Sequence, residues 1–186
     1  MNRIALLAAG AAATLLPGLA MGAIPAFCPD RPGFVLRSTA LFFQYLGSEP
    51  GQPDICRAIR DGQAVDLYSG IWDRAWPGAE NARGALQKVI SGPPGTAVTF
   101  DTVAAPGLQW HETIRNEGVE DISLLGRTFH TLKIAHERVG FGGNTYHSIV
   151  TNWKDFQTGM ILYANYQHIS GTPAPLSGWD PLAISQ

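Results

Sequence analysis

Six strand-like segments follow one another closely in the second half of the chain, and this spacing constrains the fold more than any other feature of the sequence. No helical periodicity lies between them, and short turns rich in glycine, proline and asparagine separate them. Closely spaced strands of this kind indicate an antiparallel meander rather than alternating strands and helices. We therefore predict a mainly β, single-domain fold, a curved antiparallel sheet or half-barrel meander with one short helix. The six segments are 97–103, 108–115, 119–124, 128–139, 145–153 and 160–169.

The first half of the chain contains a long apolar segment, one hairpin and one helix. Residues 34–45 are predicted to form a single strand, and residues 56–68 a hairpin whose Asp61-Gly62 pair suits the positive φ angles of a type I′ turn. The helix is predicted over 79–90, where apolar residues recur with helical spacing before a stretch rich in glycine and proline. From about residue 171 a Pro- and Gly-rich tail either wraps the sheet or stays loose.

The amino terminus carries the features of an export signal. Asn2 and Arg3 give a short positive start, an apolar run follows over 4–20, and small residues surround Gly22. This order is typical of a cleaved signal peptide, and the run is shorter than the roughly 20 strongly apolar residues of a membrane span. We predict a signal peptide at 1–22 and a mature β-rich domain at 23–186. The protein is then expected in the periplasm or outside the cell, with no transmembrane anchor after cleavage.

The chain has two cysteines, Cys28 and Cys56. An isolated pair in an exported chain most often forms a disulfide, which here would close a loop of about 29 residues and stabilise the fold by roughly 3.5 kcal/mol. Lipidation is a weaker alternative, because Cys28 follows Phe27 several residues beyond the cleavage site. A metal site is weaker too, because it needs three or four ligands close together. We therefore predict the Cys28–Cys56 disulfide.

Charge and motifs exclude several classes of function. The chain has 13 basic and 15 acidic residues and no basic run, so nucleic acid is not an expected partner. The sequence contains no G-x-S-x-G motif, no haem-attachment motif and no phosphate-binding loop. His111 begins a segment that approaches the H-E-x-x-H zinc motif, but Arg115 replaces the second histidine. No catalytic residue can be assigned, and no cofactor is expected.

A metal site would have to come from the histidines, all of which lie in predicted strands. If Trp153 pairs with Ile161 across the last turn, His147 lies opposite Gln167 and diagonal to His168. Two imidazoles still need a third donor to hold a metal. The neighbouring strand offers three candidates for that donor, His130, His136 and Glu137. Because no ligand set has convincing spacing, we predict no bound metal.

Aromatic residues are the best candidates for a binding site. Two tryptophans lie in a loop bounded by glycine and proline, with a charge pair between them, and rigid exposed indoles commonly hold sugar rings or apolar chains. The alternative is that these rings fill the core of the sheet. In the last hairpin, alternation assigns His147, Ile149, Thr151 and Trp153 to the core-facing or groove-lining side. The candidates for ligand binding are Trp72, Trp76, Trp110, Trp153 and Tyr163.

A resemblance to a group of exported proteins covers residues 95–170. Three segments carry it: GRTFHTLKI at 126–134, TNWKD at 151–155 and TGMIL at 158–162. They resemble uncharacterised bacterial envelope proteins in which a G-x-F-x-T-aliphatic-K-aliphatic strand precedes a W-x-D-x-x-T-G hairpin. The resemblance implies a curved antiparallel sheet or half-barrel of the lipoprotein-carrier kind in the cell envelope. Its motifs are structural, so it implies no catalytic residue, and it does not extend to residues 28–76.

These observations favour a non-enzymatic, soluble periplasmic β domain. We expect it to bind an apolar or saccharide-like component of the cell envelope, such as a lipid or glycan, or a partner protein, on the concave side of its sheet. One alternative is a small envelope hydrolase or isomerase that uses His and Asp or Glu as acid and base. Another is an accessory subunit of an envelope complex. Converging ionisable residues would favour the enzyme, an apolar groove the binding protein, and a flat apolar patch the subunit.

Overall fold

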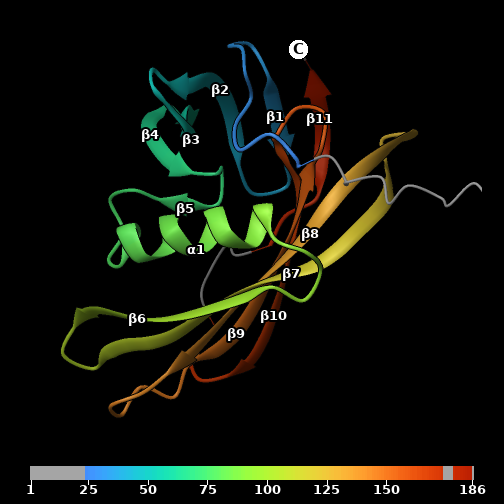
Figure 1. The fold of residues 1–186 in the computed structure, drawn as a ribbon. Coiled ribbons are helices and arrows are strands. Elements are labelled where there is room, and N and C mark those ends of the chain that lie inside the picture. Colours follow the sequence, from blue (N-terminus) through green and yellow to red (C-terminus); the bar gives the residue numbers. More distant parts are fainter. Residues whose placement is uncertain (1–23, 174–177, 186) are drawn as a thin grey trace, which may run out of the picture.

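The computed structural model describes residues 24–173 and 178–185. It confirms a mainly β, single-domain fold with antiparallel strands and one helix. The strands form two sheets that pack against each other (Figure 1). The predicted signal peptide, residues 1–22, lies outside the described residues. Within the described ranges, no helix has the length and apolar character needed to cross a membrane.

One sheet, which we call sheet A, combines the first strands of the chain with the last one. Its neighbouring strands all run antiparallel, in the order β11-β1-β2-β3-β4-β5. Part of the C-terminal tail therefore forms a strand, and Trp179, just before it, pairs with Ala164 of the other sheet. The tail thus joins the two sheets. The strands of sheet A are β1 Val35–Ser38, β2 Phe42–Glu49, β3 Gln52–Arg60, β4 Gln63–Tyr68, β5 Trp72–Asp73 and β11 Pro181–Ser185.

The other sheet, sheet B, is the meander expected from the second half of the sequence. Its strands pair antiparallel in sequence order, β10-β9-β8-β7-β6, so the region of the resemblance forms a β-sheet as expected. The long strands β7 and β8 run diagonally across the molecule and carry the twist of the sheet (Figure 1). The strands are β6 Ala97–Ala105, β7 Leu108–Leu124, β8 Arg127–Gly140, β9 His147–Asp155 and β10 Ile161–Ser170.

The predicted single strand over 34–45 is wrong, because the chain turns between β1 and β2. The Ser38 hydroxyl accepts hydrogen bonds from the backbone N–H groups of Ala40 and Leu41, at 3.3 and 2.8 Å. Serine competes for backbone groups in this way at turns. The apolar residues continue through this turn, so the sequence pattern did not indicate that the strand ends at Ser38.

The turn predicted at 116–118 is also wrong, because these residues form a bulge inside the continuous strand β7. The Asn116 side chain donates to the carbonyls of Val89 and Gly92 at the end of the helix and accepts from the Gly118 N–H. Asparagine followed closely by glycine suits a bulge as well as a turn. Here the contact with the helix keeps the strand continuous.

The turn between β3 and β4 matches its prediction. Asp61 and Gly62 both have positive φ, 51° and 84°, as a type I′ turn requires. Arg60 pairs with Gln63 across the turn. The two-residue turn thus fixes the register of this hairpin up to its end.

The helix α1, Ala79–Ser91, fills the space between β4 and β5 of sheet A and the β6–β7 side of sheet B (Figure 1). Its apolar positions recur with helical spacing, so one face is buried. These buried positions are Ala82, Ala85, Leu86, Val89 and Ile90. They share a core with Ile55, Tyr68 and Trp72 of sheet A and with Ile114, Leu132 and Ile134 of sheet B.

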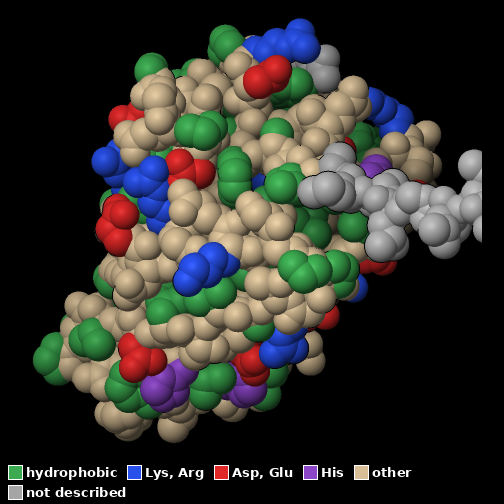
Figure 2. Space-filling view, viewed as in Figure 1, with side chains coloured by type: hydrophobic (Ala, Val, Ile, Leu, Met, Phe, Trp, Pro, Cys, Tyr) green, Lys and Arg blue, Asp and Glu red, His purple; other side chains and the backbone are tan. Residues whose placement is uncertain are grey.

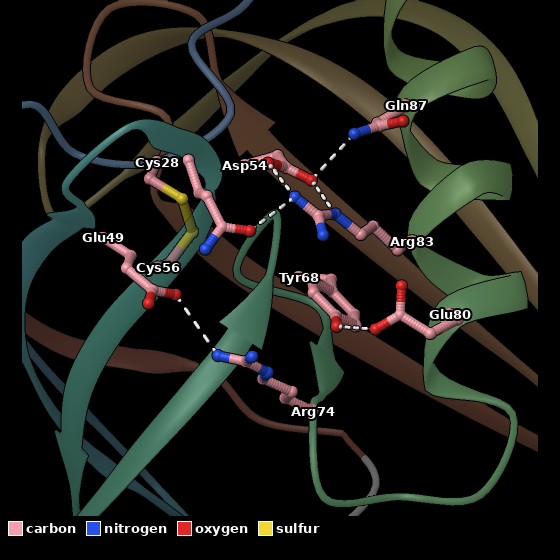
Figure 3. Close-up of polar contacts among 10 residues, drawn as sticks. Cys28, Glu49, Asp54, Cys56, Tyr68, Arg74, Glu80, Arg83 and Gln87 are labelled. Atoms are coloured by element: carbon pink, nitrogen blue, oxygen red, sulfur yellow. Dashed lines mark hydrogen bonds and ion pairs between the residues drawn. A yellow bond between two sulfur atoms is a disulfide. The ribbon is translucent and has the colours of Figure 1, made fainter.

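Polar contacts hold the helix on sheet A (Figure 3). Arg83 donates to both oxygens of Asp54, at 2.6 and 3.0 Å, and Gln87 donates to the same carboxylate at 2.8 Å. The hydrogen bond from Arg83 keeps the pKa of Asp54 below its ordinary value, although burial opposes this. Tyr68 bonds to Glu80 in the first turn of the helix. Because these polar side chains hydrogen-bond to one another, we infer that their role is to hold the helix against sheet A.

The predicted disulfide is confirmed and fastens the N-terminal segment to sheet A. Cys28 and Cys56 are bonded, their Cα atoms lie 5.2 Å apart, and both side chains are buried. The same segment lies against the β9–β10 turn. A Cβ atom added to Gly159, whose φ is 72°, would lie 2.7 Å from the Ala26 carbonyl oxygen. Glycine is therefore required there both by backbone conformation and by close approach.

Lys154 of β9 joins three separate segments. Its side chain is fully buried, and its ammonium group donates to the carbonyl oxygens of Phe27, Ser69 and Gly159, at 2.7, 3.0 and 2.5 Å. Three acceptors match the three hydrogens of an ammonium group. Burial lowers the pKa of Lys154 to about 7, opposed by the charge of Asp155. The N-terminal segment, the loop after β4 and the β9–β10 turn thus share one cation.

The last hairpin, β9–β10, differs in register from the prediction. Trp153 pairs with Tyr163 and not with Ile161, because an irregularity between Ile161 and Tyr163 inserts a residue into β10. A second irregularity, between His168 and Ser170, adds to this shift, so His147 lies opposite Ser170 and not opposite Gln167. Bulges of this kind leave no clear trace in an alternating pattern.

Candidate ligand-binding cleft

A cleft of about 350 Å³ lies between the two sheets. This volume is in the range of small-molecule sites, roughly 300–1,000 Å³. Apolar and polar side chains both line it, and both sheets contribute. The apolar wall residues are Leu41, Phe43, Tyr45, Leu67 and Ile71 from the side of sheet A, Val150, Ile161 and Ala164 from sheet B, and Trp179 from the tail.

Polar side chains also line the cleft, most of them on sheet B. Strand alternation explains their position, because His136 and Arg138 of β8 lie two residues apart and pair with Val150 and Ser148 of β9. Sheet A contributes Arg60 from the end of β3. Two guanidinium groups and one imidazole therefore line the cleft, and within the described part of the chain no carboxylate does so. The remaining polar wall residues are Tyr146, Ser148 and Asn152.

A buried carboxylate behind the wall holds two of these groups. Glu112 of β7 has no exposed surface and accepts from His136 at 2.7 Å, from Arg138 at 2.9 and 3.0 Å, and from Thr102 at 2.8 Å. Burial alone would raise the pKa of Glu112, but the contacts with His136 and Arg138 together hold it below the ordinary value. Glu112 is therefore ionised, with both of its oxygens engaged.

Arg138 makes cation–π contacts with two indole rings. Its guanidinium carbon lies 5.0 Å from the ring centre of Trp110 and 5.8 Å from that of Trp72. Cation–π contacts of this kind are stronger where water is excluded. Among the described residues, Arg138 donates only through Nε, so both terminal nitrogens remain available in the cleft.

Asp73 of β5 positions Arg60. Asp73 follows Trp72 and accepts from one terminal nitrogen of Arg60 at 2.9 Å. Consecutive residues of β5 thus contact the two arginines of the cleft, one on each sheet. The pair Arg60–Asp73 is partly exposed, with side-chain exposures of 35% and 25%.

The structure separates the five predicted aromatic residues into three places. Trp72 and Trp110 lie behind the cleft against Arg138, and Trp76 is exposed in the segment between β5 and α1. Trp153 and Tyr163 stack at 4.7 Å on the other face of sheet B. None of the five lines the cleft among the residues described there, so their role in ligand binding stays a prediction.

The predicted faces of β9 are reversed. Ser148, Val150 and Asn152 line the cleft, whereas Ile149 and Thr151 line a shallow groove on the open face of sheet B. The sequence prediction had assigned the largest ring, that of Trp153, to the core-facing or groove-lining side. Trp153 instead lies on the open face, covered by Tyr163, Lys133 and a hydrogen bond from its indole to Glu120 at 2.9 Å.

Four of the five histidines contact carboxylates, and the fifth, His168, contacts Tyr166. In addition to the pair His136–Glu112, His147 contacts Glu137 at 2.8 Å, and His111 and His130 each contact an aspartate at 2.6 Å. Within residues 24–173 and 178–185, no three His, Cys, Asp or Glu side chains lie close enough to hold a metal.

Charged side chains of both signs are interspersed over the face of the molecule that Figure 2 shows. Apolar side chains are exposed at the end of the β6–β7 hairpin, where Val103 and Leu108 are about half exposed. The cleft, which both sheets line, is the stronger candidate.

Sequence reasoning missed the two arginines of the cleft. Arg138 had a usable signal, because it continues the alternation Leu132, Ile134, His136 that marks the inner face of β8. Arg60 gave no such signal in the sequence, since a charged residue beside a hairpin turn is ordinarily exposed to solvent.

The fold and the cleft define a two-sheet antiparallel β protein with an amphipathic cavity between the sheets. No family model matches the sequence, and no curated protein matches it. Among solved structures, the chain is similar to the hypothetical lipoprotein YmcC from Escherichia coli K12, with 15% identity and a TM-score of 0.44 over 74% of this chain and 79% of that one. A likeness of this degree does not establish a shared fold or a shared role.

Proposed function

We propose that this protein is an exported domain that binds a small apolar or amphiphilic component of the cell envelope between its two sheets. The cleft carries the proposal, because apolar side chains and polar groups line the same cavity between the sheets, and such a mixed lining suits an amphiphilic ligand. The export features of the sequence and the buried disulfide support an oxidising compartment such as the periplasm.

Binding is better supported than acid–base catalysis. An acid–base pair at the cleft would consist of His136, which lines it, and Glu112, which lies behind its wall. Glu112, however, is ionised and already accepts hydrogen bonds from three side chains. A carboxylate stabilised in this way is a poor proton acceptor. No hydroxyl or thiol among the described residues hydrogen-bonds to His136 as an activated nucleophile would.

Filling the cleft should abolish the binding of an apolar probe. Val150→Phe places a ring in the cleft, so we expect it to weaken the affinity for N-phenyl-1-naphthylamine, an uncharged dye that fluoresces in apolar sites, by about tenfold or more. Dye titration of the folded variant measures this.

The matched control is Ile149→Phe, the same kind of change at the next residue, which faces the open side of sheet B. It should bind the dye like the wild type, and urea unfolding of both variants checks that the fold is retained. Equal dye binding by all three proteins would place the dye elsewhere, and no binding by the wild type would refute the proposed function.

A further inference from the structure

We propose that the ligand of this cleft is an amphiphile with an acidic head group, a carboxylate or a phosphate, held by Arg138 and Arg60. The inference rests on the proposed function and adds the chemistry of the ligand. Its basis is that unused hydrogen-bond donors of Arg138 and apolar side chains line the same cleft.

The guanidinium of Arg138 has donors without acceptors among the described residues. Glu112 uses only the Nε atom of Arg138, so both terminal NH₂ groups remain for a ligand. A single oxyanion can accept hydrogen bonds from both of these groups at once.

The guanidinium is also pre-oriented for such a ligand. The Nε group contacts both oxygens of Glu112, and two indole rings lie at cation–π distance, so little side-chain freedom is left to lose on binding. A planar fork of N–H groups matches the oxygens of a carboxylate or phosphate.

Charge favours an anion over a cation. Arg138 lines the cleft, whereas Glu112, the carboxylate that it contacts, lies behind the wall. Arg60 adds a second guanidinium from the opposite sheet and gives only one nitrogen to Asp73. An acid between the arginines would therefore link sheet A to sheet B.

The remainder of the cleft suits an apolar tail. Beyond the polar groups, the wall consists of side chains such as Phe43, Leu67 and Ile161, and the buried Tyr45 stays un-ionised because burial raises its pKa. A head group at the arginines thus leaves the tail in contact with apolar surface, and removing that surface from water favours binding.

Displacement of N-phenyl-1-naphthylamine tests the inference. Decanoate, decyl phosphate and decanol share one tail and differ in the head group. For the wild type we expect at least one of the two acids to displace the dye at about tenfold lower concentration than decanol. Which acid is stronger then identifies the head group.

Arg60→Gln is the deciding variant, because Arg60 is partly exposed and its loss leaves Glu112 paired. It should reduce the preference for the acid to about threefold or less, while decanol displaces the dye as before. Arg57→Gln, the same change at an exposed position of the same strand, should keep the full preference.

Two results would overturn the inference while leaving the proposed function intact: equal displacement by acids and alcohol in the wild type, or a full preference for the acid in Arg60→Gln. Absence of dye binding by the wild type would remove the proposed function and this inference together.

Discussion

Replacing Lys154 by methionine is expected to lower the free energy of unfolding by several kcal/mol. The substitution leaves the carbonyls of Phe27, Ser69 and Gly159 buried without a donor, and each such acceptor costs about 1–3 kcal/mol. Methionine also removes the cost of burying an ammonium group, which offsets part of the loss. Because three acceptors are orphaned together, we expect the loss to dominate, within a total stability of about 5–15 kcal/mol for a domain. Urea unfolding measures it.

The pH dependence of stability gives an independent test of this lysine. Its pKa is about 7 in the folded protein and 10.5 ordinarily, so between these values the unfolded chain binds more protons. The cost of burying the charge is fully present below pH 7 and is relieved as the pH rises towards 10.5. The wild type should therefore gain more stability than Lys154→Met between pH 7 and pH 10.

The control for both measurements is Lys88→Met, at an exposed position of the helix. It should change stability by less than about 0.5 kcal/mol. If Lys154→Met were as stable as the wild type at pH 7, the three hydrogen bonds would have no net value. If its pH dependence matched the wild type, the buried charge would not be the titrating group.

Removing the disulfide is expected to have the second-largest effect. The double variant Cys28→Ala/Cys56→Ala should lose roughly 3.5 kcal/mol, because the unfolded chain regains the freedom of a closed loop whose ends are 28 residues apart in sequence. Using the double variant avoids leaving one reactive thiol. Urea unfolding of both proteins, with and without dithiothreitol, measures the difference.

Reductant should destabilise the wild type and leave the double variant unchanged. Intact-mass measurement after alkylation should detect no free thiol in the non-reduced wild type. Two alkylated thiols in that sample, or equal stability of wild type and double variant, would contradict the assignment of the disulfide as a stabilising bond.

Local patterns predicted the parts of the fold that local chemistry determines. The Asp61-Gly62 turn follows from the positive φ angles that a two-residue hairpin needs, and the helix follows from its spacing of apolar residues. The bulge at Asn116 could not be predicted, since its contacts are with carbonyls of the helix that are distant in sequence. Strand β11 was missed because proline and glycine around it resemble an irregular tail.

The cleft could not be predicted from the sequence, because it depends on how the two sheets pack against each other. Arg60 and Arg138 belong to different sheets, and only their packing places both in one cavity. The aromatic candidates illustrate the same limit. Trp72 and Trp110 support the cleft from behind, while Trp153 is covered by side chains of neighbouring strands on the opposite face. Size and aromatic character do not reveal which face of a strand is inside when both faces are covered.

The pairing of β1 with β11 has a consequence for the order in which the molecule folds. Val35 and Ser185 are partners in sheet A although 150 positions separate them (185 − 35), whereas each hairpin of sheet B closes over a short turn. Long-range closure is entropically expensive and slow compared with local pairing. Sheet B can therefore assemble while sheet A still lacks its outer strand. Until β11 arrives, the edge of β1 offers unpaired backbone groups to any other extended chain, and this is the stage at which the protein is most exposed to misassembly.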